Sequence, residues 1–417
     1  MPTTFFMLAG EASGDSHAAK LITALKALEA DVRFIGMGGP KMAAAGLDVA
    51  KDLDGMQVVG FWEVARRYGF FKRVFQELLD RVKQERPSAL ICVDYPGFNL
   101  RFAKEVRRLG IPVLYYIVPQ VWAWKAMRAK SMARYVDRAF CVFEFEPPFF
   151  EKFGLKTQFV GHPLIDDCGL RIADCGLKLP PGPKTVAFLP GSREPELAAH
   201  MPQFYGAMKT CKANNYRFMV SFPSGITTAY YRMYKSLLAE ESPPYDPIGV
   251  PGTPTDETDF APLEQNAIAV GFKVHAPLSE AACSAGAHLS HARLLPAAAD
   301  FSVVKSGTST LEAGLAGNPM CVVYKSSFLS YAIAHLVVNI PVFSLVNIVL
   351  GRYAVPELLQ GEVNPSRIAQ ELERGLTDEK YREQQKAALA ELPKKLGGPG
   401  ASARAAKGIM DFLKGSG

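Results

Sequence analysis

The chain has 417 residues, of which 48% are hydrophobic and 21% are charged. This length is too great for one ordinary core and this composition is not that of a disordered chain, so both favour a globular α/β protein with two domains. Lys and Arg outnumber Asp and Glu by 47 to 41, a net charge of +6. That excess suits an anionic membrane surface or phosphorylated ligands and is too diffuse to favour nucleic acid.

The cysteines and the apolar segments bear on the compartment. The seven cysteines are odd in number and form no CxxC pair, so we expect reduced thiols in a cytoplasmic chain. The first apolar run has no basic segment before it and ends at Glu11, which favours a strand over a signal peptide. Residues 327–350 carry no Lys, Arg, Asp or Glu, but Pro341 interrupts them, so we favour a buried helix followed by a loop over a membrane span.

The chain opens with a strand at 4–8, a glycine-bearing turn at 10–15 and a helix at about 16–30. This succession is typical of a doubly wound α/β fold. The glycine spacing is G-x-x-x-G and not G-x-G-x-x-G, which disfavours a nicotinamide dinucleotide site. Asp52-Leu53-Asp54 matches the DxD of metal-dependent sugar-nucleotide enzymes, but two aspartates at this spacing are common by chance, and no metal site is predicted.

Residues 60–79 interleave aromatic and basic side chains in one helical pattern. Such a helix suits a surface that dips into anionic lipid or holds an acylated phosphate. An ordinary core helix with a solvated basic face explains the same pattern equally well.

A buried strand at 89–93 places Asp94 at its carboxyl end, within CVDYPGFN. Ligands of open α/β sheets bind at the carboxyl ends of strands, so Asp94 is a candidate general base. Its alternative role is the N-cap of the following helix. Further on, PQVWAW at 119–124 brings two tryptophans beside a basic helix, where they suit a sugar or an acyl chain near a phosphate.

A second strand, turn and helix begins at 185, after a Gly-, Pro- and Cys-containing linker. Its turn carries Arg193, which suits a diphosphate that is neutralised without metal. A further strand at 301–304 ends at Ser306-Gly307-Thr308, and the helix that follows directs backbone N–H groups and a positive dipole end out of the turn. Glu312 lies one helical turn beyond Thr308, where a carboxylate suits ribose hydroxyls. The alternative is a capped core helix with an exposed Glu.

These elements predict two doubly wound Rossmann-like domains that face a cleft. We expect a first domain at 1–167, a linker at 168–184 and a second domain at 185–360. The charged helices of 361–417 are expected to pack back on the first domain.

Seven sequence motifs, in order, cover nearly the whole chain. They are GEASGD at 10–15, VGFWEV at 59–64, PQVWAW at 119–124, FVGHPL at 159–164, LPGSR at 189–193, SGTSTLE at 306–312 and VPELLQ at 355–360. Together they resemble the lipid-A-disaccharide synthases, glycosyltransferases of the GT-B type. The chain differs from the usual family pattern at Gly97, where DYPGFN replaces DAPDFN, and at residues 288–295; its loop at 241–266 is extended.

The resemblance implies an inverting transfer of 2,3-diacylglucosamine from its UDP carrier to 2,3-diacylglucosamine 1-phosphate (lipid X), which gives the β-1,6 disaccharide and UDP. It implies that the domain at 1–167 faces the acceptor and the membrane and that the domain at 185–360 binds the UDP-sugar. It also implies no cofactor and no metal, the two lipid substrates and the inner-membrane surface as partners, and no nucleic acid, and it is compatible with a homo-oligomer. A GT-B epimerase acting on UDP-N-acetylglucosamine and an inactive peripheral membrane protein that binds nucleotide and lipid remain the alternatives.

The candidate site residues fall into three groups. Asp94 is the catalytic candidate. The UDP and diphosphate group consists of Gly191, Ser192, Arg193, Ser306, Gly307, Thr308, Thr310, Glu312 and Asn318. The acceptor and lipid group consists of Gly10, Glu11, Ser13, Gly14, Asp15, Trp62, Gln120, Trp122 and Trp124.

Overall fold

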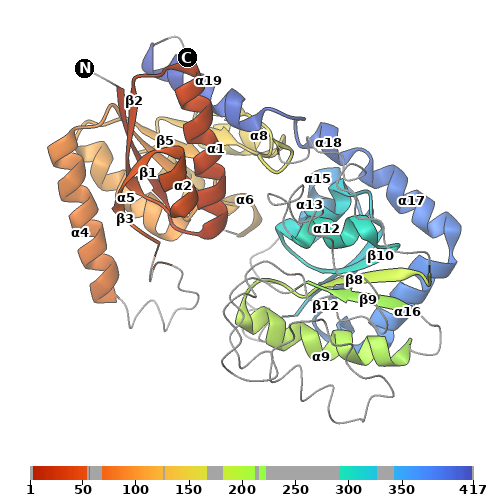
Figure 1. The fold of residues 1–417 in the computed structure, drawn as a ribbon. Helices are drawn as coiled ribbons and strands as arrows, with labels where there is room; N and C mark the ends of the chain where they lie inside the picture. Colours follow the sequence, from red (N-terminus) through yellow and green to blue (C-terminus); the bar gives the residue numbers. More distant parts are fainter. Residues whose placement is uncertain are drawn as a thin grey trace. The chain divides into compact units, whose positions relative to one another are not determined.

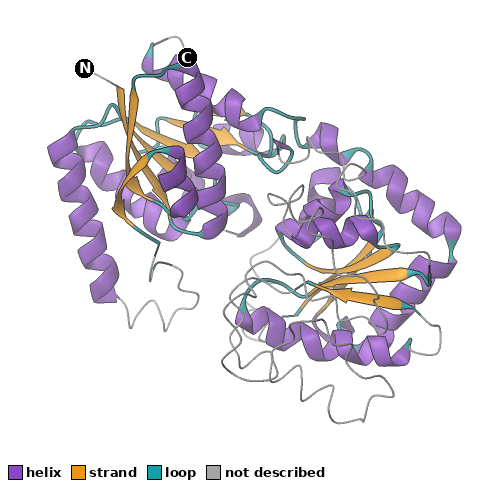
Figure 2. Cartoon of the chain, in the orientation of Figure 1, coloured by secondary structure: helices purple, strands orange, loops and turns teal. Residues whose placement is uncertain are grey.

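The computed structural model describes residues 3–53, 56, 68–124, 127–166, 182–211, 216–221, 291–325 and 342–415. The chain divides into two compact units, the first formed by residues 1–166, 337–339 and 395–417 and the second by residues 167–336 and 340–394. Each unit is an α/β layer structure with its own sheet (Figure 1, Figure 2). The predicted α/β class with two doubly wound sheets is confirmed.

The first unit holds a parallel sheet of seven described strands, in the order β3-β2-β1-β4-β5-β6-β7. The strands are β1 (Thr3–Ala9), β2 (Val32–Met37), β3 (Leu47–Lys51), β4 (Ala89–Val93), β5 (Val113–Tyr116), β6 (Arg138–Cys141) and β7 (Thr157–Phe159). The order reverses between β1 and β4, so this pair forms the topological switch point at which doubly wound sheets bind ligands. The helices are α1 (Ala12–Leu28), α2 (Pro40–Ala45), α4 (Tyr68–Glu85), α5 (Pro96–Arg108), α6 (Val121–Trp124), α7 (Met127–Met132), α8 (Glu146–Glu151) and α19 (Ala401–Leu413).

The second unit has a parallel sheet of five described strands, in the order β12-β11-β10-β8-β9. The strands are β8 (Thr185–Leu189), β9 (Arg217–Val220), β10 (Phe301–Lys305), β11 (Met320–Tyr324) and β12 (Glu357–Leu359). Here the order reverses between β8 and β10, which form the second switch point. The helices are α9 (Glu194–Thr210), α12 (His291–Ala298), α13 (Thr308–Leu315), α15 (Leu345–Leu350), the 3₁₀ turn η5 (Gln360–Glu362), α16 (Pro365–Thr377), α17 (Glu379–Leu389) and α18 (Leu392–Lys395).

The C-terminal helices divide between the units, unlike the prediction that all of 361–417 packs on the first domain. Helix α16 buries Ile368, Leu372 and Leu376 in the core of the second sheet. Only the last helix, α19, lies beside α1 in the first unit (Figure 1). Helix α16 stays with the second unit because its apolar face is buried there. The sequence shows this apolar face but not which of the two sheets it packs against.

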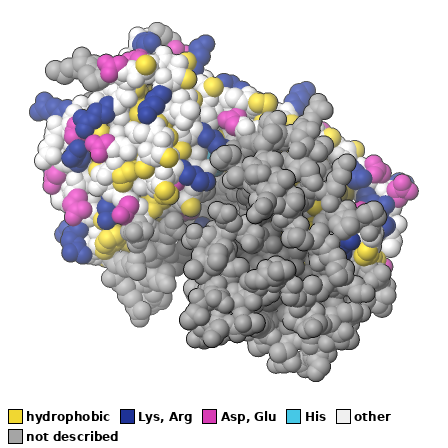
Figure 3. Space-filling model, in the orientation of Figure 1, with side chains coloured by type: hydrophobic (Ala, Val, Ile, Leu, Met, Phe, Trp, Pro, Cys, Tyr) yellow, Lys and Arg dark blue, Asp and Glu magenta, His cyan; other side chains and the backbone are white. Residues whose placement is uncertain are grey.

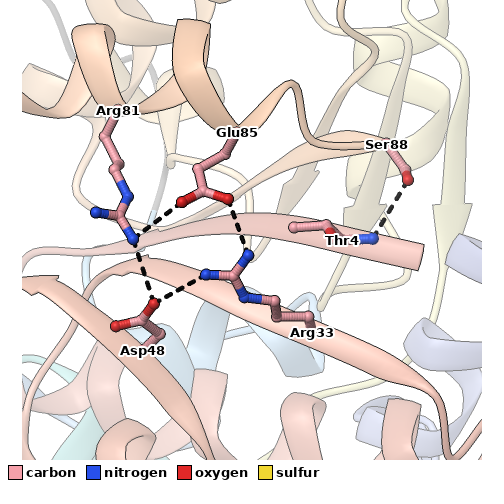
Figure 4. Close-up of polar contacts among 6 residues, drawn as sticks. All are labelled: Thr4, Arg33, Asp48, Arg81, Glu85 and Ser88. Carbon is pink, nitrogen blue, oxygen red and sulfur yellow. Dashed lines mark hydrogen bonds and ion pairs between the residues drawn. The ribbon is translucent and has the colours of Figure 1, made fainter. Parts of the chain in front are cut away.

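Helix α4 is fastened to the edge of the first sheet by four charged side chains (Figure 4). Arg33 of β2 lies 2.9 Å from Glu85 and 3.2 Å from Asp48, and Arg81 contacts the same two carboxylates at 2.9 and 3.4 Å. These groups are partly exposed, so each pair contributes about 0–1 kcal/mol. Together, the four contacts hold α4 in one position along β2 and β3.

The described surface shows no concentration of basic charge on the face that can be seen. Lys and Arg side chains alternate with Asp and Glu over the visible face of the first unit (Figure 3). In the described part of the chain, no helix is long and apolar enough to cross a bilayer. The four cysteines in that part, Cys92, Cys141, Cys211 and Cys321, are buried free thiols.

Candidate functional site

Asp94 lies at the switch point of the first sheet. Val93, the last residue of β4, pairs with Ala9, the last residue of β1. The chain therefore leaves the sheet at two adjacent points, into Gly10 and Glu11, which lead directly into α1 at Ala12, and into Asp94. This is the position at which the sequence predicted a catalytic carboxylate.

The backbone at this position is strained. Five non-glycine residues of the described chain have positive φ, and three of them stand at the carboxyl ends of β4 and β5: Asp94 at +47°, Tyr95 at +48° and Ile117 at +59°. Side chains with a β-carbon rarely adopt this conformation, and each such residue costs about 1–3 kcal/mol. Strain of this kind persists only where neighbouring groups enforce it.

Two buried side chains enforce the conformation of Asp94. The amide of Asn99, which is fully buried on α5, donates to the Asp94 carbonyl at 2.8 Å and lies 3.3 Å from the carbonyls of Leu8 and Val93. The Tyr115 hydroxyl on β5 donates to the same Asp94 carbonyl at 2.6 Å. Both of these bonds are made to the backbone carbonyl of Asp94.

Gly10 and Tyr95 complete this part of the site. A β-carbon on Gly10 would lie 2.2 Å from the Tyr95 ring, so only glycine permits the ring to cover the end of β1. The Tyr95 hydroxyl donates to the carbonyl of Met56 at 2.8 Å. Gly97, by contrast, is exposed, and a β-carbon there would meet nothing within 4 Å. A carboxylate at 97 would therefore point into open space, on this unit taken alone.

The other residues of the GEASGD motif at 10–15 have different surroundings, and those from Ala12 onward belong to α1, which begins earlier than the predicted start at about 16. Asp15 is buried, and its carboxylate accepts N–H groups from Gly39 at 2.8 Å, Lys41 at 3.1 Å and Met42 at 3.0 Å. It caps the start of α2, and the structure gives it a role in the fold that the sequence prediction missed. Glu11 is the N-cap residue of α1, Ser13 is exposed and Gly14 is buried.

Trp122 of the PQVWAW motif is held by a buried carboxylate, Glu146, for which no sequence motif gave a signal. Its indole N–H donates to Glu146 Oε1 at 3.1 Å, while Glu146 Oε2 accepts the N–H groups of Val142 and Phe143 at 3.0 Å each. Burial raises the pKa of Glu146 to about 7, against the lowering effect of these three donors. Gln120 is exposed. Trp62 and the side chain of Trp124 lie outside the described residues, as do residues 241–266 and 288–290.

In the second unit, two turns meet at the switch point. Leu189 at the end of β8 pairs with Val304 on β10, so the turns at 190–193 and 306–308 are adjacent. Gly191 has a φ of +115°, and a β-carbon there would lie 2.4 Å from Glu196 Oε2. That oxygen accepts the N–H groups of Ser192 at 3.0 Å and Arg193 at 3.4 Å, so Glu196 holds the first turn in shape from the first turn of α9.

The second turn leads directly into α13. Gly307, with a φ of +153°, is the N-cap residue and offers no side-chain acceptor to the first N–H groups of the helix. The Thr310 hydroxyl donates to the Gly307 carbonyl at 2.8 Å. Ser306 and Glu312 are buried. An open helix start beside Arg193, whose side chain is 48% exposed, is suited to an anion such as a diphosphate.

Asn318, which the sequence analysis assigned to the UDP group, lies away from the two turns. It precedes β11 and so lies at the amino ends of the parallel strands, whereas the two turns lie at their carboxyl ends. Its carbonyl oxygen accepts from the Ser302 hydroxyl at 2.6 Å and its amide donates to the Ala299 carbonyl. It links the loop before β10 to the loop before β11. We therefore do not include it in the anion seat, by which we mean the turns at 190–193 and 306–308 together with the start of α13.

The described residues hold no group of three or more His, Cys, Asp or Glu side chains that is arranged to bind a metal ion. Asp54 of the DxD motif is outside these residues. The positive groups at the second switch point are a helix start and basic side chains, whose chemistry fits an anion.

Solved structures with the same architecture span the whole chain. A putative UDP-N-acetylglucosamine 2-epimerase from Listeria monocytogenes matches 100% of this chain and 98% of its own, with a TM-score of 0.59 and 11% identity. The kitacinnamycin glycotransferase matches 99% of this chain and 100% of its own, with a TM-score of 0.59 and 16% identity. Their likeness concerns the fold. The chain is thus an α/β protein of the class that contains GT-B glycosyltransferases and epimerases.

Sequence relatives define the family. The model of the lipid-A-disaccharide synthetase family matches residues 5–246 and 279–406. The lipid-A-disaccharide synthase of Anaeromyxobacter dehalogenans is 37% identical over 98% of this chain and 97% of its own length. This chain belongs to the lipid-A-disaccharide synthetase family, a family of glycosyltransferases. The prediction from the seven motifs is confirmed.

Proposed function

We propose that this chain moves 2,3-diacylglucosamine from UDP-2,3-diacylglucosamine to the 6-hydroxyl of 2,3-diacylglucosamine 1-phosphate, with inversion, and releases UDP. The observation that carries the proposal is Asp94, a carboxylate on a strained backbone at a sheet switch point in a chain of this family. Inversion requires a base that removes the acceptor proton while the sugar leaves UDP. Asp94 is that base, and a positioned base contributes about 10²–10⁴-fold to the rate.

The second unit binds the UDP part of the donor in this proposal. Negative charge develops on the UDP oxygen as the glycosidic bond breaks. Arg193 and the N–H groups at the start of α13 stabilise that charge, because such groups lie in place before the reaction. Glu312 takes the ribose hydroxyls. This arrangement needs no metal ion, so the reaction should proceed in EDTA.

Both substrates carry acyl chains, and we propose that the enzyme works at the cytoplasmic surface of the inner membrane. The start of α4 supports this: Tyr68 is 62% exposed, and Lys72 and Arg73 are exposed near it. Phe70 and Phe71 are partly buried against the core of the first unit, which is compatible both with a lipid-facing helix and with an ordinary core helix. Exposed aromatic and basic groups together favour an anionic lipid surface.

The test is a direct assay of both products. Purified protein is incubated with UDP-2,3-diacylglucosamine and the 1-phosphate acceptor in EDTA, and UDP and disaccharide are followed by mass spectrometry. We expect product from the wild type and a loss of about 10²–10⁴-fold in kcat for Asp94→Asn, which preserves shape and removes the base. UDP binding by the variant should be unchanged. A variant that keeps wild-type kcat would refute the role of Asp94, and a wild type that binds UDP without turnover would refute the transferase.

A further inference from the structure

A lysine outside the seven family motifs lies between the two turns of the second unit. Lys305 is the last residue of β10 and directly precedes the turn at 306–308. Its ammonium Nζ is 2.6 Å from Glu196 Oε1, and the two side chains are only 15% and 17% exposed. The same Nζ is 3.9 Å from the place that a β-carbon on Gly307 would occupy. The charge therefore lies at the wall of the anion seat.

We propose that Lys305 is a second diphosphate-binding cation, which Glu196 holds in position beside the start of α13. The inference rests on the proposed function, because it assigns a new residue to the UDP site of that reaction. It deepens that function by giving the seat two cations, one from each turn.

The charges of the three side chains support this assignment. Arg193 and Lys305 carry two positive charges, and Glu196 carries one negative charge at 3.7 and 2.6 Å from them. The set has a net charge of +1 with Lys305 and is neutral without it. A diphosphate carries at least two negative charges. Without Lys305, the charge of Glu196 cancels that of Arg193, and within this set only the positive end of the α13 dipole remains to attract the diphosphate.

Glu196 is ionised, as the pairing requires. Burial alone would raise the pKa of its carboxyl, but the charge and hydrogen bond of Lys305, with the N–H of Ser192, lower the pKa below its usual value. One carboxylate therefore holds both turns: Oε2 accepts the backbone N–H groups of 192 and 193, and Oε1 accepts the ammonium of Lys305. An ammonium has three donors, and Glu196 engages one of them, so the pair leaves Lys305 with donors of the right kind for phosphate oxygens.

A purely structural ion pair is the competing explanation, and calorimetry with UDP distinguishes the two. We expect Lys305→Met to weaken UDP binding roughly 10- to 100-fold, the value of a hydrogen bond to a charged group, and Lys305→Arg to retain most of the affinity. Binding of uridine, which has no phosphate, should be unchanged. The matched control is Lys386→Met on α17, which removes the same charge from an exposed lysine paired with Glu383.

A double variant protects the test against misfolding, since Lys305→Met leaves Glu196 partly buried without its partner. Lys305→Met with Glu196→Gln removes both charges, so the thermal unfolding midpoint should recover towards that of the wild type. UDP affinity should recover only in part, because Glu196 no longer offsets the charge of Arg193 but the hydrogen bonds from Lys305 to the phosphates stay absent. Wild-type UDP affinity in Lys305→Met, or its complete recovery in the double variant, would overturn the proposal. If weakened UDP binding in Lys305→Met accompanies a wild type that forms no disaccharide, the proposed reaction is wrong and the role of Lys305 stands.

Discussion

The hydroxyl of Tyr115 provides a selective test of how Asp94 is held. In Tyr115→Phe the ring stays in the core and the 2.6 Å bond to the Asp94 carbonyl is lost. Burial raises the pKa of Tyr115 well above its usual value, so the hydroxyl is a neutral donor throughout any assay range. The amide of Asn99 remains bound to the same carbonyl at 2.8 Å. The substitution thus removes one of two side-chain supports.

The size of the effect follows from the hydrogen bond and the strain. A neutral hydrogen bond contributes about 0.5–1.5 kcal/mol to stability. Asp94 and Tyr95, both with left-handed backbones, together store about 2–6 kcal/mol. When a support is lost, the backbone relaxes part of that strain and the carboxylate leaves its position for a fraction of the time. If the whole 0.5–1.5 kcal/mol reappears in the barrier, kcat falls about 2- to 12-fold.

The assay measures kcat, the KM of both substrates and the free energy of unfolding in urea. We expect kcat to fall, the KM for the UDP-sugar to stay unchanged and stability to drop by about 1 kcal/mol. Tyr116→Phe is the matched control, because Tyr116 is the next residue of β5 and lies on the opposite side of the sheet near Ser402 of α19. A lower stability with wild-type kcat in Tyr115→Phe would refute the reasoning, since the hydroxyl would then serve the fold alone.

Two further predictions concern the same unit. Gly10→Ala puts a methyl group 2.2 Å from the Tyr95 ring and should lower kcat at least about 10-fold, because it displaces the ring. Combining Gly10→Ala with Tyr95→Ala removes the clash and should recover part of the lost kcat. If the single and the double variant have the same kcat, the steric explanation is wrong. The second uses the Glu146 carboxyl, whose pKa burial raises to about 7 in the folded chain from an ordinary 4.5. The folded state then holds its proton more tightly, so this group contributes stability that is fully present below pH 4.5, is lost as the pH rises to about 7 and is constant above. The difference in unfolding free energy between wild type and Glu146→Gln should change by about 3 kcal/mol over that range in urea titrations, and a difference independent of pH would contradict it.

Much of the fold and the position of Asp94 could be predicted from local patterns. The run at 89–93 is apolar throughout, as a strand buried on both faces must be, and its end places Asp94 at the carboxyl edge of a parallel sheet. The turns at 190–193 and 306–308 follow two further buried strands in the same way. These features depend on residues that are neighbours in sequence.

The supporting residues could not be predicted because they come from distant parts of the chain. Lys305 and Glu196 are 109 residues apart in sequence and meet only because β8 and β10 are adjacent. The sequence does not show that Asn99 and Tyr115 share an acceptor, because that acceptor is a backbone carbonyl, which every residue has. Asn318 shows the reverse case: it follows the SGTSTLE motif closely, but the helix carries the chain across the sheet, and the residue lies at the amino end of β11.

The two switch points are supported in different ways, and the difference separates binding from catalysis. Around Asp94 the two bonds from Asn99 and Tyr115 end on its backbone carbonyl, so they set the position of the carboxylate through the backbone. At the second switch point a carboxylate, Glu196, does the holding, and the groups it orients are backbone N–H donors and a lysine. Changes to the supports of Asp94 should therefore appear in kcat, where a displaced base is costly. Changes to the Lys305–Glu196 pair should appear first in the affinity for UDP, because its charge acts on the phosphates both before and during bond cleavage.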